Sequence, residues 1–554
     1  MTPFLPASAP IAARPARWLT GLTLLIAALV AVPIVSVASN VFSAGTGATW
    51  AHLAATLLPD YVVTSLQLCI GVGIGTALLG VGSAWLVTHL DFAGRRQFEW
   101  ALVLPLAMPA YVMAYTYTDL LQFAGPLQSA LREATGWTRA DYRLPEIRST
   151  GGAVLMFASV LYPYVYLLAR TAFLERGGGV LEAGRSLGLT PWQSFVRVSL
   201  PMARPAIAAG VALALMETLA DYGTVSYFAV QTFTTGIYRA WFSLGDRTAA
   251  AQLSMCLLGF VALVLALEQA SRGRARFHGS GLRRQPPRGP LLTGWRAVAA
   301  FAGCCIPLVL GFAIPSAVLL HMALTQGDAQ FGARFVELAR NSLVVSSLTA
   351  LLAVACAMGV AYARRLDPGP VTRLAHWTAG MGYALPGSVI AVGVLIPVAR
   401  LDNALVQWLA ASFGRQGGLL LTGSIAALVF ACLVRFLASA LHSVDAALHR
   451  VTPHMDDAAR SLGLTPVRVL RQVHVPLLRR GLLTAGLLVF IDVMKELPAT
   501  LVMRPFNFDT LATQAYTLAS DERLAEASTA SLAIVAVGLL PLVVLCRQIA
   551  KERP

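Results

Sequence analysis

Charged residues are scarce in this chain. Only 12% of its 554 residues are charged and 57% are hydrophobic, whereas soluble domains carry about a quarter charged residues. This balance excludes an ordinary soluble globular protein and predicts a membrane protein. Lysine is scarcer still, because only Lys495 and Lys551 stand among the 42 basic residues. Neither lies in the Gly-x-x-x-x-Gly-Lys-Ser/Thr pattern of a phosphate-binding loop, so any ATP hydrolysis must come from another chain.

Motifs for enzymatic chemistry are also missing. The seven cysteines lie in apolar runs without a Cys-x-x-Cys pair, so they are interpreted as packing residues rather than a disulfide framework or metal site. The sequence has no HExxH or GxSxG motif, and its nine histidines are scattered. It therefore predicts no catalytic residue and no cofactor, argues against a membrane enzyme, and defines no metal site.

Long apolar runs, in contrast, are abundant. A helix needs about 20 mostly apolar residues to cross a bilayer, and twelve runs of that kind predict an all-α polytopic membrane protein. The first run follows Arg14 and Arg17 and could be a signal peptide, but its length favours an uncleaved span. The predicted spans are approximately 18–39, 62–88, 98–121, 152–174, 203–228, 249–268, 296–321, 341–363, 374–399, 418–440, 478–502 and 527–546.

The positions of the basic residues predict the orientation. If both termini are cytoplasmic, the inside segments carry most of the Lys and Arg residues, as the positive-inside rule requires. The stretch Ser271–Pro290 alone has six arginines and no acidic residue. We interpret it as a flexible cytoplasmic connector near anionic membrane lipid, rather than as a nucleic-acid-binding segment.

A repeated segment divides the chain into two halves. The sequence RSLGLTP occurs at 185–191 and at 460–466, and 460 − 185 = 275. Because each half has six predicted spans, the halves share one orientation, and a pathway is expected where they meet. The predicted regions are a cytoplasmic N-terminus (1–17), a first half (18–268, core about 60–268), a basic cytoplasmic linker (269–295), a second half (296–546, core about 338–546) and a cytoplasmic C-terminus (547–554).

Both copies of the repeat predict a helical hairpin on the cytoplasmic side. Gly188 and Gly463 follow the first helix, where a residue free to adopt positive φ can end it. Pro191 and Pro466 then suit the start of the next helix.

These segments resemble the EAA loop of type I ABC importer permeases: E-A-A, three residues, Gly, nine residues, aliphatic-x-aliphatic-Pro. The departures are Gly184 for the second Ala, Asp457 for Glu and Val475 for Leu. In that family the short helix couples the permease to a separate ATPase subunit. The resemblance implies two tandem six-helix permease repeats in a bacterial inner membrane, two ATPase copies and a periplasmic substrate-binding protein. The coupling residues that it implies are Glu182, Ala183, Gly184, Gly188 and Pro201 in loop 181–201, and Asp457, Ala458, Ala459, Gly463 and Pro476 in loop 456–476.

Two further stretches, Met216–Phe242 and Met494–Tyr516, resemble the fused permease subunits of bacterial iron(III) importers, which are about this long. Fused permeases for thiamine or aminoalkylphosphonate have the same layout and remain alternatives. A self-sufficient secondary transporter with six plus six spans is another hypothesis, but it gives no reason for two matched inside-face hairpins.

Acidic residues inside predicted spans are candidates for the pathway, because buried charge in a membrane is costly. Glu217 and Asp221 lie four residues apart, as do their repeat partners Asp492 and Glu496, which predicts one helix face for each pair. Tyr222 adjoins Asp221, and carboxylate and phenolate oxygens suit a hard cation such as iron(III). The alternative is a scaffold role in which these acids pair with Lys495, Arg170 or Arg435. Asp119, near the outer end of the third span, is expected to be interfacial.

Overall fold

The computed structural model describes residues 17–41, 47–186, 188–272, 291–325, 332–414, 418–449 and 451–551. In these ranges the chain is helical, and its only β pairing is an isolated bridge between Asp91 and Leu291. Most of the predicted basic linker lies outside the described residues.

The helices before the linker follow the predicted spans with short helices between them. They are α1 (Arg17–Val41), α2 (Gly47–Thr56), α3 (Leu58–His89), α4 (Arg95–Ala101), η1 (Leu104–Ala107), α5 (Ala110–Leu121), α6 (Pro126–Thr135), α7 (Thr150–Ser186), α8 (Pro191–Ser194), η2 (Phe195–Ser199), α9 (Leu200–Ala220), α10 (Gly223–Tyr227), α11 (Phe233–Tyr238), η3 (Arg239–Ser243) and α12 (Arg247–Arg272).

A similar series follows the linker. It comprises α13 (Trp295–Leu308), η4 (Val309–Ala313), α14 (Ile314–Thr325), α15 (Ala333–Leu366), α16 (Pro370–Ala379), η5 (Gly382–Ala384), α17 (Gly387–Phe413), α18 (Ile425–Leu448), α19 (Pro453–Ser461), α20 (Pro466–Val469), η6 (Leu470–His474), α21 (Val475–Met494), α22 (Pro498–Met503), α23 (Leu511–Ser520) and α24 (Leu524–Lys551).

The chain forms two compact units, which do not coincide with the two sequence halves. Unit 1 comprises Met1–Val32, Ser347–Tyr383 and Cys432–Phe490, and unit 2 comprises Pro33–Ser346, Ala384–Ala431 and Ile491–Pro554. Unit 2 therefore contains most of the first half together with α22, α23 and α24 of the second. Unit 1 contains the second hairpin.

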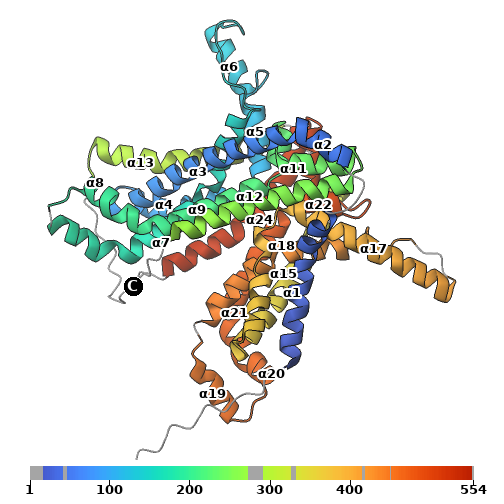
Figure 1. Ribbon diagram of the computed structural model, residues 1–554. Helices are drawn as coiled ribbons and strands as arrows, with labels where there is room; N and C mark the ends of the chain where they lie inside the picture. Colours follow the sequence, from blue (N-terminus) through green and yellow to red (C-terminus); the bar gives the residue numbers. More distant parts are fainter. Residues whose placement is uncertain are drawn as a thin grey trace, which may run out of the picture. The chain divides into compact units, whose positions relative to one another are not determined.

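Close helix packing forms the core of unit 2, where α7 packs against both α3 and α9 (Figure 1). A Cβ atom added to Gly80 of α3 would lie 2.7 Å from the Val165 Cβ, and one added to Gly210 of α9 would lie 2.7 Å from the Val165 Cα. Glycine is therefore needed at both positions. Small residues at helix contacts are typical of membrane proteins, in which close approach of backbones stabilises packing.

The described residues contain ten helices long and apolar enough to cross a membrane, or eleven if one bent helix pair forms a single span. The sequence predicted twelve. The expected eleventh span is not among them because α21 carries three charged residues, Arg479, Arg480 and Asp492, within its 20 residues. The all-helical, multi-span fold is confirmed.

Two predicted spans break at a proline. In the first half, η1 ends before Pro109, and the segments on either side of this break are bent by 91°. In the second half, η5 ends before Pro386 and α17 begins at Gly387. A residue before proline disfavours helical backbone, so continuous spans at 98–121 and 374–399 were wrong. The break occurs in both halves.

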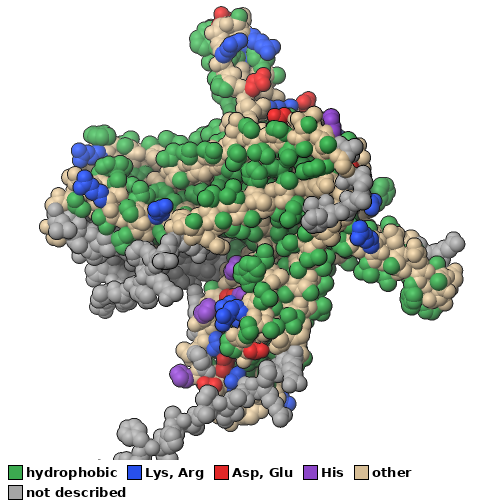
Figure 2. All heavy atoms as spheres, in the orientation of Figure 1, with side chains coloured by type: hydrophobic (Ala, Val, Ile, Leu, Met, Phe, Trp, Pro, Cys, Tyr) green, Lys and Arg blue, Asp and Glu red, His purple; other side chains and the backbone are tan. Residues whose placement is uncertain are grey.

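The outer faces of long helices expose apolar side chains. Ile70, Ile74 and Leu78 of α3 are 61%, 57% and 70% exposed and repeat every four residues on one helix face. In Figure 2, hydrophobic side chains cover much of α3 and α12, whereas charged side chains gather on α6 and around α19. Such exposed apolar stripes suit contact with lipid.

Candidate coupling and translocation sites

The two EAA segments share a backbone geometry. Gly188 and Gly463 have φ angles of +77° and +79°, and the helices that follow begin at Pro191 and Pro466 as predicted. A π-helical turn comes next in each copy, at Phe195–Ser199 and Leu470–His474. Because 470 − 195 = 275, the irregular turn belongs to the repeat. Such turns are often found at functional sites.

The first helix of the hairpin differs between the copies. In the second half it is the separate helix α19, whereas in the first half the equivalent residues are the last turns of the long helix α7. The expectation of a separate short helix is therefore wrong for the first copy. The side chains of Glu182 and Ala183, and that of Arg185, lie outside the described residues.

The second hairpin is anchored by Asp456 rather than by its predicted neighbour Asp457. Asp456 is 7% exposed, and its carboxylate lies 2.7 Å from both Arg365 Nε and His474 Nε2. Asp457 is largely exposed, and its carboxylate lies 3.9 Å from Arg460 Nη1. Arg365 also donates to the carbonyl groups of Leu448 and Val451, so one arginine ties α15 to the hairpin.

The chemistry around Asp456 is that of a buried polar cluster. His474 is fully buried, and its burial lowers the pKa of the imidazole against the opposing effect of Asp456. Tyr362 donates a 2.9 Å hydrogen bond to the Pro466 carbonyl, and its ring packs edge-on against that of His474. We define Tyr362, Arg365, Asp456 and His474 as the polar anchor.

The first hairpin is anchored by aromatic rings instead. The Trp85 ring centroid lies 6.1 Å from that of Trp192 and 5.1 Å from that of Phe195. The ring of His89 packs against that of Phe173 at 5.3 Å. His89 precedes Leu90-Asp91 just as Arg365 precedes Leu366-Asp367, so equivalent ends of α3 and α15 hold the two hairpins by different interactions.

In each half, a side-chain contact joins the long helix that leads into the hairpin to a preceding short helix. Arg170 of α7 lies 3.3 Å from Glu99 of α4, whereas Asp445 of α18 lies 2.7 Å from His376 Nε2 of α16. Arg170 and Asp445 are repeat partners, since 445 − 170 = 275. Arg170 therefore pairs with Glu99, and not with a pathway acid as the scaffold hypothesis considered.

Asp221 and Glu496 each cap a short helix after a break. Helix α9 ends at Ala220, and the Asp221 carboxylate accepts 2.8 Å and 3.3 Å hydrogen bonds from the N–H groups of Thr224 and Val225. Helix α21 ends at Met494, and the Glu496 carboxylate accepts a 2.8 Å hydrogen bond from the Ala499 N–H. The predicted single helix faces for Glu217–Asp221 and Asp492–Glu496 are therefore wrong, because the helix ends inside each pair.

Asp492 is held by an ion pair at the end of α21. Lys495 Nζ lies 3.0 Å from its carboxylate, and both side chains are partly buried. Lys495 therefore pairs with Asp492 rather than with the adjoining Glu496. Glu217 is partly buried in the last turn of α9, and Asp119 is partly buried in α5.

Tyrosines converge where elements of the two halves meet inside unit 2. The Tyr222 and Tyr238 rings stack with centroids 3.7 Å apart, and the Tyr516 ring lies 5.8 Å from that of Tyr222. Tyr238 donates to the Pro498 carbonyl, and Ser226 Oγ lies 3.0 Å from the Tyr516 hydroxyl. The tyrosine cluster comprises Tyr111, Tyr115, Tyr222, Tyr227, Tyr238 and Tyr516.

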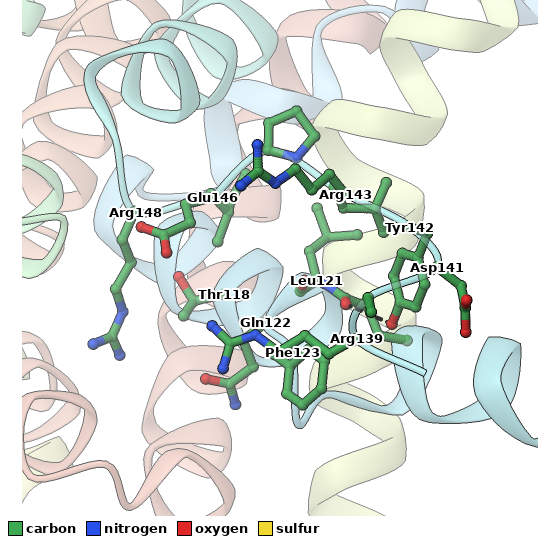
Figure 3. Close-up of a pocket in the computed structure, with 15 residues that line it drawn as sticks. Thr118, Leu121, Gln122, Phe123, Arg139, Asp141, Tyr142, Arg143, Glu146 and Arg148 are labelled. Atoms are coloured by element: carbon green, nitrogen blue, oxygen red, sulfur yellow. Dashed lines mark hydrogen bonds between the residues drawn. The ribbon is translucent and has the colours of Figure 1, made fainter. Parts of the chain in front are cut away.

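A cavity of about 1140 Å³ opens beside this cluster, between α5 and the chain that leads from α6 to α7 (Figure 3). Arg139, Arg143 and Arg148 line it together with two acids, Asp141 and Glu146. Arg148 donates a 3.2 Å hydrogen bond to the Tyr227 hydroxyl, and the Tyr227 ring lies 4.7 Å from that of Tyr115. The cavity wall is therefore continuous with the tyrosine cluster.

Known proteins resemble both halves of this chain. Residues 78–275 match the family described as the inner-membrane component of binding-protein-dependent transport systems. The sulfate transport permease CysW of Escherichia coli is 30% identical over 220 residues, which are 39% of this chain and 72% of that protein. The chain belongs to this family.

Other permeases of the family extend the comparison. The Fe(3+)-transport permease FbpB 2 of Haemophilus influenzae is 25% identical over 537 residues, covering 96% of this chain and 98% of that protein. The sulfate permease CysT of Escherichia coli is 30% identical over 169 residues, 30% of this chain and 58% of that protein. As a permease of this family, the protein is a multi-pass membrane subunit of an ABC import system, which in general includes an ATPase and a substrate-binding protein.

The polar anchor and most of the tyrosine cluster of this permease were not predicted from its sequence. Arg365 and His474 are 91 and 18 residues from Asp456 (456 − 365 and 474 − 456), so no local motif joins them. The sequence did give one indication of Arg365: like His89 in the first half, it stands directly before a Leu-Asp pair. Within the described residues, no three His, Cys, Asp or Glu side chains come together as a metal-binding group.

Proposed function

We propose that this permease imports iron(III) from the periplasm into the cytoplasm. The observation that carries the proposal is the similarity to the Fe(3+)-transport permease FbpB 2, which extends over nearly all of both chains. The sulfate permeases, in contrast, match 39% and 30% of this chain. The similarity thus extends along the whole length of a permease named for Fe(3+) transport.

ATP hydrolysis belongs to a separate subunit in this proposal, with one ATPase copy at each hairpin. The exposed residues Gly188, Asp457 and Gly463 lie at the docking surface, and the polar and aromatic anchors transmit movement to α15 and α3. Glu182, Ala183, Gly184, Pro201, Ala458, Ala459 and Pro476 complete the coupling segments. Both chain termini and the basic linker are cytoplasmic, so the two halves have the same orientation across the membrane.

Substrate passes where the halves meet, along Glu217, Asp221, Tyr222, Asp492 and Glu496. The close approach of Tyr222, Tyr238 and Tyr516 supports this assignment, because these residues come from both halves. Asp221 and Glu496 combine two roles: each caps a short helix, and each brings a carboxylate to the junction. The cavity beside α5 is the entrance from the binding protein.

Sulfate import is the second candidate function. The 30% identity to CysW over 39% of this chain favours it, and three arginines in the cavity suit an anion. The carboxylates beside the tyrosine cluster oppose it, since like charges repel.

An uptake experiment separates the two functions. The permease is reconstituted in vesicles with its partner ATPase and binding protein, and ATP-dependent accumulation of radioactive iron(III) and of radioactive sulfate is measured in parallel. We expect iron to accumulate and excess sulfate not to compete. Accumulation of sulfate without iron would reject the iron assignment while leaving the family assignment intact.

A further inference from the structure

Two hydroxyl groups in the tyrosine cluster have no hydrogen-bond partner among the described residues. The side chains of Tyr111 and Tyr115 are 4% and 2% exposed, and neither hydroxyl makes a hydrogen bond within the described part of the chain. A buried hydroxyl without a partner is costly, because it has lost its bonds to water. Unsatisfied polar groups in native proteins often mark sites that another molecule completes.

The two tyrosines continue a line of polar groups that begins at the cavity. Tyr111, Tyr115 and Thr118 follow one face of α5, at intervals of four and three residues (115 − 111 and 118 − 115). Thr118 lines the cavity (Figure 3). Tyr111 lies about 10 Å deeper along the helix, at about 1.5 Å per residue. The line therefore runs from the cavity wall to the junction of the halves.

Oxygen groups surround the two unpartnered hydroxyls. The Tyr115 ring lies 5.8 Å from that of Tyr111 and 4.7 Å from that of Tyr227. Tyr516 and Asp221 stand near enough to the Tyr115 hydroxyl, and Asp221 and Glu496 near enough to that of Tyr111, to act on a negative charge there. These partners come from both halves of the permease, and each offers phenol or carboxylate oxygen.

Backbone packing holds Tyr111 at the junction. A Cβ atom added to Gly223 would lie 2.7 Å from the Tyr111 Cβ and 2.8 Å from the Leu497 Cδ2. Gly223 begins α10, which Asp221 caps, and Leu497 precedes α22, which Glu496 caps. The two capped helices thus meet at Tyr111.

We propose that the hydroxyls of Tyr111 and Tyr115, with the carboxylates of Asp221 and Glu496, form a transient oxygen-ligand site for iron(III) in transit. The inference rests on the proposed iron import. Iron(III) is a hard cation that favours such ligands. Each phenol that binds the metal as phenolate releases one proton to water, and no electron is transferred.

Tyrosine-to-phenylalanine variants test the site in the assembled complex. Iron(III) nitrilotriacetate is titrated into the purified complex, and the visible phenolate-to-iron charge-transfer band is recorded. The unaltered protein should develop the band, and Tyr111→Phe/Tyr115→Phe should lose it. The apparent affinity for iron and the rate of iron uptake should both fall by about tenfold or more, since replacing a residue that only hydrogen-bonds to a metal ligand already costs that much.

Tyr162→Phe is the matched control. The Tyr162 side chain is also fully buried, and its hydroxyl makes no hydrogen bond within the described ranges, but it packs in a different cluster, with Ala84 and Tyr166. Neither variant should lower the thermal midpoint, because phenylalanine removes buried hydroxyls that make no bond. If the double variant does not fold, the two single variants provide the same comparison.

Two results would overturn the inference, and they are distinguishable. If the unaltered permease imports iron, and the double variant binds and imports it equally well, the site is wrong while the proposed function stands. If the unaltered permease imports sulfate and no iron, the proposed function fails and the iron site fails with it.

Discussion

Asp221 and Glu496, 275 residues apart (496 − 221), accept the same backbone hydrogen bond in the two halves of the permease. Asp221 accepts from the N–H of Thr224 and Glu496 from that of Ala499, each at 2.8 Å and each three residues ahead. Both carboxylates thus start a short helix directly after a long one ends. Both halves therefore have a helix break followed by a carboxylate cap, although the capping side chain is aspartate in one half and the longer glutamate in the other.

Substitutions of Asp221 and Glu496 distinguish a structural role of these carboxylates from a role in substrate passage. An amide oxygen can still accept the backbone hydrogen bond, so Asp221→Asn and Glu496→Gln should keep the thermal midpoint while lowering iron uptake through loss of charge. Asp221→Ala and Glu496→Ala should lose about 1 kcal/mol of stability as well. Equal midpoints for the amide and alanine variants would contradict capping. Unchanged uptake in the amide variants would remove these charges from the pathway.

Substitutions at Asp492 and Lys495 should have strongly coupled effects on stability, because the two side chains form an ion pair. Asp492→Asn leaves a partly buried ammonium group without its partner, so it should destabilise the protein by about 1–3 kcal/mol. Asp492→Asn/Lys495→Gln removes both charges and should recover most of that loss. The thermal midpoints of both single variants and the double variant form a double-mutant cycle. If the two single losses of stability simply add in the double variant, the pair contributes no stability.

The polar anchor predicts that substitutions at two adjacent aspartates change stability by very different amounts. Asp456→Asn removes the charge that faces Arg365 and His474, so it should destabilise the second hairpin by about 3 kcal/mol and weaken ATPase co-purification. Asp457→Asn lies on the exposed side and should change stability by less than about 0.5 kcal/mol. The thermal midpoint of each variant is the measurement, and equal losses at both positions would contradict the anchor.

The hairpin glycines should tolerate asparagine but not valine. A Cβ atom at Gly188 or Gly463 would meet no atom of the described residues within 4 Å, so the expected cost of substitution comes from positive φ. Gly188→Val and Gly463→Val should each cost about 1–2 kcal/mol locally and reduce ATPase binding and transport. Asparagine adopts positive φ more readily, so Gly188→Asn and Gly463→Asn should bind the ATPase nearly normally. Normal coupling in the valine variants would show that these turns do not position the docking surface.

Repetition and apolar runs predicted the helical fold and the turn geometry. Gly188 and Gly463 were identified because glycine, proline and the surrounding residues recur together, and turn chemistry is local. The break before Pro109 was missed because hydropathy continues across it, although proline itself was the indication. The break after Ala220 was likewise hidden, since Asp221 has extended backbone after α9 and its carboxylate caps the next helix, which the helical spacing does not reveal.

The remaining site residues depend on long-range packing. Asp457 matched the family motif, yet Asp456 is the buried anchor because Arg365 of α15 and His474 of η6 fold against it. The tyrosine cluster joins Tyr111, Tyr222 and Tyr516, which are separated by more than one span. Their meeting depends on the association of the halves, and no local sequence pattern records it.

The most direct test of the central claim measures ATP hydrolysis and iron accumulation in the same vesicles, with and without the partner ATPase. The chain lacks a phosphate-binding loop, so vesicles that contain the permease alone should neither hydrolyse ATP nor accumulate iron. Adding the ATPase and the iron-loaded binding protein should produce both activities together. Hydrolysis by the permease alone, or accumulation without ATP under an ion gradient, would contradict the assignment of this chain as the membrane subunit of an ATP-driven iron importer.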